Sequence, residues 1–91
     1  MAKLHIEHKT SLSKDDIRVK LGEVMGKIEE KFDIKGSWSG DDYAFSRSGV
    51  DGKASIKDGL VTIDMKLGLV LSALKGRIES EMVSKLKEGL P

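Results

Sequence analysis

The chain has 91 residues, of which 38% are hydrophobic and 34% charged, a composition typical of a globular domain. Its 16 basic and 15 acidic residues are interspersed, so no polycation is available for nucleic acid or anionic lipid. The absence of cysteine excludes disulfides and thiolate chemistry. The apolar run at residues 67–74 is far shorter than the roughly 20 residues that span a bilayer. Because residues 1–5 are too polar for a signal peptide, we expect one cytoplasmic domain over residues 1–91.

Residues 3–8 alternate, with Leu4 and Ile6 on one face, which predicts a short half-buried strand. Ser13 is then a good N-cap for a helix, and Asp15 and Asp16 in its first turn suit the helix dipole. Apolar residues recur at helical spacing as far as residue 32. These positions are Ile17, Leu21, Val24 or Met25, Ile28 and Phe32.

Gly22 and Gly26 interrupt this helix at a four-residue spacing. Each costs about 1 kcal/mol relative to alanine, which predicts a compensating contact. Close packing against the sheet or the second helix is the favoured interpretation. A homodimer seam of the small-xxx-small kind is the alternative, although such motifs are diagnostic mainly in lipid.

From residue 34 the apolar period becomes two, which predicts a strand with Trp38 on its inner face. After a turn at residues 40–42, Tyr43, Phe45 and Arg47 share one face of the next strand. Pairing across the turn sets Trp38 beside Tyr43 or Phe45, a favourable aromatic contact.

Residues 48–52 are predicted to turn the chain into its best-defined hairpin, around Asp58-Gly59. A two-residue type I′ loop there opposes Ile56 to Val61, Ala54 to Ile63, Ser55 to Thr62 and Lys53 to Asp64. Apolar residues then meet apolar residues, and opposite charges meet. A slip of one residue would destroy both patterns.

Beyond residue 67 the period is helical again, with a stripe that consists of Leu71, Leu74, Ile78, Met82 and Leu86. Gly76 leaves open whether this helix starts near Leu69 or near Arg77. On a helical wheel the core stripe takes Val70, Leu71 and Leu74. The opposite face is small and weakly polar, and consists of Leu69, Ser72, Ala73, Gly76 and Ser80. It is a candidate interaction surface; alternatively, Leu69 covers the end of the sheet.

The resulting order is β-α-β-β-β-β-α. It predicts an α+β fold in which a twisted, mainly antiparallel sheet carries two helices on its apolar face.

Few residues suggest chemistry. His5 and His8 point to opposite faces of a strand, so they cannot share a metal ion. No Ser-His-Asp set or carboxylate pair stands out, and we expect no catalysis, no metal and no cofactor. Arg47 falls on the apolar face, where a charge needs a partner. It either reaches water at the end of the sheet, or lines a cavity mouth where it meets an anionic ligand close to Trp38 and Tyr43.

Four segments are familiar as a set: residues 4–8 (LHIEH), 45–52 (FSRSGVDG), 66–68 (KLG) and 73–81 (ALKGRIESE). In this order, and across nearly the whole chain, they resemble the small bacterial family of polyhydroxyalkanoic acid system proteins of the granule region. The resemblance implies a link to polyhydroxyalkanoate storage and brings no catalytic residues with it. Many members have proline where Arg77 stands. The order of elements is also similar to a reduced helix-grip fold, which would allow an apolar cavity.

Two hypotheses follow. The first is a non-catalytic accessory protein of polyhydroxyalkanoate storage, located in the cytoplasm at storage granules. Its Leu69 face would contact a granule surface, a granule protein or a second copy in a homodimer. The second is a small carrier for an apolar acid, such as a hydroxyacyl chain, held between sheet and helices. Neither hypothesis involves nucleic acid.

Overall fold

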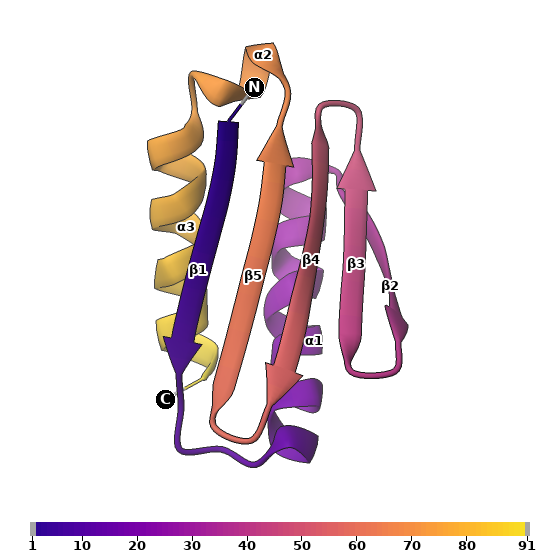
Figure 1. Ribbon diagram of the computed structural model, residues 1–91, viewed down its shortest axis with the longest axis vertical. Helices are drawn as coiled ribbons and strands as arrows, with labels where there is room; N and C mark the ends of the chain where they lie inside the picture. The colour runs from indigo at the N-terminus through magenta and orange to yellow at the C-terminus, as the bar shows by residue number, and fades with distance from the viewer. Residues whose placement is uncertain (1, 91) are drawn as a thin grey trace.

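The computed structural model describes residues 2–90 and has the predicted order of elements (Figure 1). They are β1 (Ala2–Lys9), α1 (Lys14–Phe32), β2 (Lys35–Ser39), β3 (Asp42–Arg47), β4 (Val50–Lys57), β5 (Leu60–Leu67), α2 (Leu69–Ser72) and α3 (Lys75–Gly89). The five strands form one sheet in the order β1-β5-β4-β3-β2, with every neighbouring pair antiparallel. The predicted α+β class and architecture are confirmed.

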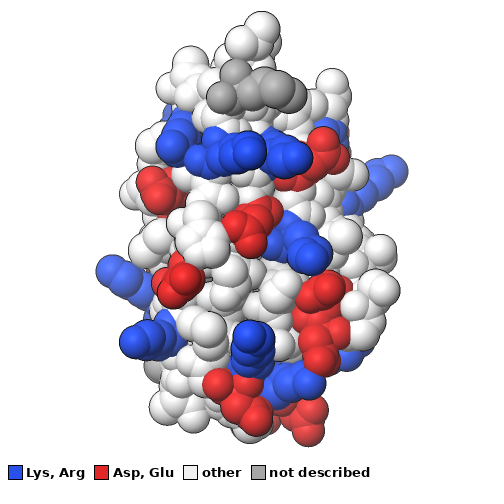
Figure 2. Space-filling model, viewed as in Figure 1, with Lys and Arg blue, Asp and Glu red and all other residues white. Residues whose placement is uncertain are grey.

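Helices α1 and α3 both lie behind the sheet, so one face is covered and the other is open (Figure 1). The covered face buries the apolar set predicted from strand parity, including Leu4 and Ile6 of β1. The open face carries interspersed acidic and basic side chains (Figure 2). Sheet and helices therefore enclose a single core, as one-sided burial of an antiparallel sheet requires.

Helix α1 begins as its sequence predicts, because the Ser13 hydroxyl accepts a hydrogen bond from the Asp16 amide at 3.4 Å. It ends at Asp33, whose left-handed backbone (φ 54°) lets its amide bond to the carbonyl of Glu29. The predicted reason for Gly22 and Gly26 is wrong. A Cβ at either position would meet nothing within 4 Å, so neither glycine permits a close approach within the chain.

The hairpin between β4 and β5 has all four predicted residue pairs. Its turn type differs from the prediction. Type I′ needs positive φ at both loop residues. Gly59 has φ 75°, but Asp58 does not have positive φ, because Asp33 is the one non-glycine residue with positive φ in residues 2–90. Asp58 serves instead as an anchor, because its carboxylate accepts the Lys14 amide at 2.8 Å. The predicted turn at residues 48–52 is also shorter, since Val50 already pairs with Arg47.

The last helical segment is broken, and one of its predicted faces is wrong. Short helix α2 crosses the end of the sheet, residues 73–74 turn, and α3 runs back down (Figure 1). In α3 the predicted stripe holds, with Ile78 and Met82 buried. In α2, however, Val70 is 85% exposed although the helical wheel assigns it to the core, and Leu74, in the turn that follows, is 44% exposed. Both lie past the strand ends, where no sheet is available to cover them.

Local contacts explain the break. The Gly68 amide donates to the Gly49 carbonyl at 2.8 Å, which fixes the chain to the turn between β3 and β4. A Cβ at Gly68 would lie 3.3 Å from the Gly49 Cα, so glycine permits this approach. The Ser72 hydroxyl then donates to the Gly68 carbonyl at 2.8 Å and closes the short helix on itself.

Candidate functional site

A cavity of about 270 Å³ lies between the sheet and the helices, at the end of the molecule where α2 crosses. Its walls come from α1 and Ile34 just beyond it, from the end of β3, from β4 and β5, and from the α2–α3 segment. Nine of its twelve lining side chains are apolar: Ile28, Phe32, Ile34, Val50, Met65, Leu71, Leu74, Ile78 and Met82. The other three are the cations Lys31, Arg47 and Arg77.

This hollow is larger than the packing defects of ordinary protein interiors, which seldom exceed one water molecule. If it were closed and empty it would cost about 6 kcal/mol, from its 270 Å³ and roughly 24 cal/mol per Å³. That cost is comparable with the whole folding stability of a small domain. The hollow therefore has to be filled through its mouth, either by water or by a ligand.

Two of the three cations at the hollow keep free hydrogen-bond donors. Arg47 donates from Nη1 to the carbonyl of Phe32 at 2.7 Å, at the C-terminal end of α1. Because a guanidinium has five N–H donors, most of its donors stay available. The side chain of Arg77 makes no hydrogen bond or ion pair with any other residue in the range 2–90.

The third cation is already paired. Lys31 of α1 forms an ion pair with Glu81 of α3, with 2.6 Å between Nζ and Oε1. The hydrogen bond from Lys31 lowers the pKa of the Glu81 carboxyl below its usual value. Lys85, four residues after Glu81 in the same helix, lies beside Glu88 instead, at 3.8 Å. The Lys31–Glu81 pair thus ties the two helices together next to the cavity.

The predicted ligand contacts divide into two groups. Arg47 is exposed and also lines the cavity, so it reaches water and borders the hollow at once. Trp38 and Tyr43 are absent from the lining. Their rings contact each other across β2 and β3, with centroids 5.2 Å apart, and Arg18 covers Trp38 at 4.7 Å. Tyr43 is buried in the core and Trp38 packs against that core, so both lie on the covered face of the sheet but outside the lining of the hollow.

The predicted interaction face is split by the break before α3. Leu69 is 81% exposed, and Ala73, Gly76 and Ser80 are also exposed. Ser72 is half-buried and hydrogen-bonded within its own turn. The most apolar surface is instead the tip formed by Leu69 and Val70, with half-exposed Leu74 beside it. We call these three residues the α2 tip.

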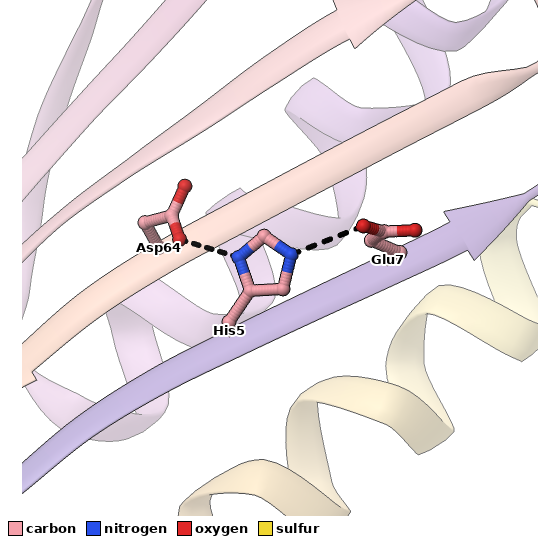
Figure 3. Close-up of polar contacts among 3 residues, drawn as sticks. All are labelled: His5, Glu7 and Asp64. Atoms are coloured by element: carbon pink, nitrogen blue, oxygen red, sulfur yellow. Dashed lines mark hydrogen bonds and ion pairs between the residues drawn. The ribbon is translucent and has the colours of Figure 1, made fainter.

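A cluster of three titratable groups on the open face of the sheet is shown in Figure 3. His5 lies between two carboxylates, with Nδ1 2.5 Å from Asp64 Oδ1 and Nε2 3.2 Å from Glu7 Oε1. Hydrogen bonding to Asp64, and then to Glu7, raises the pKa of His5 above its ordinary value. All three side chains are more than half exposed, and no nucleophile adjoins them among the contacts of residues 2–90. The cluster is a surface ion-pair network.

His8 points away from this cluster, as the strand spacing predicts. Its Nε2 donates to the carbonyl of Leu90 at 2.5 Å and so ties β1 to the end of α3. In residues 2–90 there is no group of three histidine, cysteine, aspartate or glutamate side chains placed to hold a metal ion. Nor does that part of the chain contain a helix with the length and apolar character needed to cross a membrane.

Sequence reasoning missed two of the three cations. Lys31 lies in the last turn of α1, where a cation suits the helix dipole, and Arg77 stands out in the sequence only through the resemblance to the family. The signal available was topological: α1 ends and α3 begins at the same end of an antiparallel layer, so residues 31 and 77 meet there. Position 77 lies in the first turn of α3, where a proline, as the family resemblance implies, would be tolerated.

Together, the one-sided sheet and its hollow define a small α+β sheet-and-helix domain with an apolar cavity under its terminal helix. The family model described as "Putative polyhydroxyalkanoic acid system protein" matches residues 4–90, and the chain belongs to that family. No curated protein and no solved structure matches the chain.

Proposed function

We propose that this protein is a non-catalytic accessory protein of polyhydroxyalkanoate storage, which works in the cytoplasm and attaches to the granule surface through the α2 tip. The family membership supports the link to storage. One observation carries the attachment: Leu69 and Val70 are adjacent, 81% and 85% exposed, and at the extremity of the fold. Large side chains that stay in water together usually mark an interaction surface.

The attachment energy can be bounded from the side chains. Burying one leucine or valine contributes about 1.5–3 kcal/mol, so Leu69 and Val70 together give about 3–6 kcal/mol. That range corresponds to weak, reversible binding for one protein, which suits a protein that exchanges between granule and cytoplasm. The same energy is too small for a stable homodimer of this protein, because stable protein–protein interfaces bury a far larger area than these two side chains offer.

The test is sedimentation of the protein with polyhydroxyalkanoate particles, using the double variant Leu69→Glu, Val70→Glu. Val19→Glu is the matched control, because Val19 is an apolar residue 63% exposed on α1 and away from the α2 tip. We expect the double variant to lose particle binding and the control to bind as the wild type does.

Three results would contradict the proposal. Equal sedimentation of the double variant and the wild type would remove the α2 tip from the binding surface. Equal losses in the double variant and in Val19→Glu would show a nonspecific effect of added charge. Self-association that the double variant abolishes, without any particle binding by the wild type, would assign the tip to a second copy instead.

A further inference from the structure

We infer that the cavity between the sheet and the two long helices binds an aliphatic carboxylate, with the chain inside the hollow and the carboxylate at Arg47 and Arg77. This inference does not rest on the proposed attachment to granules, because the cavity lining and the α2 tip have only Leu74 in common. Three properties of the cavity support it: the chemistry of its interior, the charge at its mouth and its size.

The interior accepts only an apolar body. Val50 and Met65 form the sheet wall, and Ile28 and Ile78 form the helix walls. The lining has no acidic, amide, hydroxyl or imidazole side chain. A sugar, nucleoside or peptide placed there would lose its hydrogen bonds to water without replacement, which strongly disfavours binding. A hydrocarbon chain has no such bonds to lose.

The mouth selects an anion. Arg47 retains donors after its bond to α1. Arg77 forms no hydrogen bond or ion pair in residues 2–90, and Glu81, whose pKa its charge helps to lower, is already bonded to Lys31. Planar guanidinium groups match the two oxygens of a carboxylate. In addition, the first turn of α3 adjoins the cavity, contains no acidic residue and has no side-chain cap. The positive end of that helix therefore reinforces the two arginines.

The volume sets the length of the chain. At about 30 Å³ for each water-sized atom, a cavity of 270 Å³ holds roughly nine non-hydrogen atoms. Hexanoate and octanoate bracket this number. A longer chain has to protrude past Leu74, which is half-exposed at the border of the cavity.

Calorimetric titration of the whole protein with octanoate tests the inference, with 1-octanol as the neutral ligand and octylamine as the cationic one. The charge variant is Arg77→Met. Its matched control is Lys75→Met, which removes a cation from the same helical turn but outside the cavity lining. We expect Arg77→Met to weaken octanoate binding by about tenfold or more, as for loss of a charge-assisted hydrogen bond. Binding of 1-octanol should change less than twofold, and Lys75→Met should leave both ligands unaffected.

A second variant tests the hollow itself. Leu74→Trp should obstruct the cavity and abolish binding of octanoate and of 1-octanol, while the melting temperature shows that the protein is folded. Leu69→Glu with Val70→Glu should bind octanoate as the wild type does, so the inference and the granule proposal can fail separately.

The inference is wrong if octanoate does not bind at concentrations up to roughly 10 mM, where affinity is negligible. It is also wrong if octylamine binds as well as octanoate, or if Arg77→Met and Lys75→Met weaken octanoate equally. Undiminished octanoate binding by folded Leu74→Trp would place the ligand outside this cavity.

Discussion

Replacing Gly22 and Gly26 by alanine should stabilise this protein substantially. Both glycines lie inside helix α1, and an added Cβ at either position meets no atom within 4 Å. Each substitution should therefore contribute the full helix-propensity difference of about 1 kcal/mol. The sum is about 2 kcal/mol, and a domain of this size gains about 4–8 °C in melting temperature per kcal/mol. The double variant should melt about 8–16 °C above the wild type.

The measurement is thermal and urea unfolding of the two single variants and the double variant, followed by circular dichroism. Gly89→Ala is the control, because a Cβ there would overlap the Cγ2 methyl of Val24 on α1. That branched side chain has little rotamer freedom, so the control should lose about 1–3 kcal/mol. These results together would show that glycine lowers stability at positions 22 and 26, where a Cβ has free space, and is required at position 89, where α3 contacts α1.

One result would refute this reasoning. If the double alanine variant is no more stable than the wild type, something outside the chain covers α1 at these glycines. Sedimentation equilibrium would then identify it. A wild-type dimer that the alanines weaken would establish the small-residue seam between two copies, the alternative that remains a prediction.

Three further predictions concern single contacts. Asp64→Asn should lower the pKa of His5 toward 6.5 in an NMR titration, because the hydrogen bond to Asp64 is the largest cause of the raised pKa. Any stability that this pair contributes is complete below pH 6.5 and is lost as the pH rises through the folded-state pKa of His5. Gly52→Ala should destabilise the fold by about 1–3 kcal/mol in urea unfolding, because its Cβ would overlap the ring of Phe45. The same substitution made in a Phe45→Leu variant, which has no ring at this position, should cost much less. Arg47→Met should lower the free energy of unfolding by about 0.5–1 kcal/mol in the same assay, since it removes the cation at the end of α1. An unchanged urea midpoint would show that the hydrogen bond from Arg47 to Phe32 does not contribute to stability.

The strands were predictable because the alternation of apolar and polar residues is local, and each cross-strand pair has to agree with the same register. Each residue pair of the β4–β5 hairpin tests the register again, and a slip would have placed Ile56 and Val61 in water. The turn type was not predictable in the same way. Asp58 could have adopted a left-handed backbone, but its carboxylate is used by the Lys14 amide. That contact joins residues 44 positions apart, so no local pattern reports it.

The candidate site was only partly predictable, for a related reason. Parity alone placed Arg47 on the covered face at a sheet end, and the structure puts it at the cavity. Lys31 and Arg77 come from helix ends that meet only in the tertiary fold. Helical periodicity also failed at Val70, because it assumes a continuous axis. The fixed contact between Gly68 and Gly49 breaks that axis first.

This break accounts for both proposed surfaces. If α3 continued straight through residues 69–74, its stripe would place Val70 and Leu74 against the core, as the sequence pattern predicts. Leu74 could then fill part of the hollow, and the α2 tip would no longer project. The Gly68–Gly49 contact and the Ser72 hydroxyl bond hold the segment across the sheet end instead. An apolar tip and an open cavity are therefore two consequences of one change in chain direction. A substitution that weakens this contact should affect both surfaces together, whereas charges at Leu69 and Val70 or loss of Arg77 should affect only one.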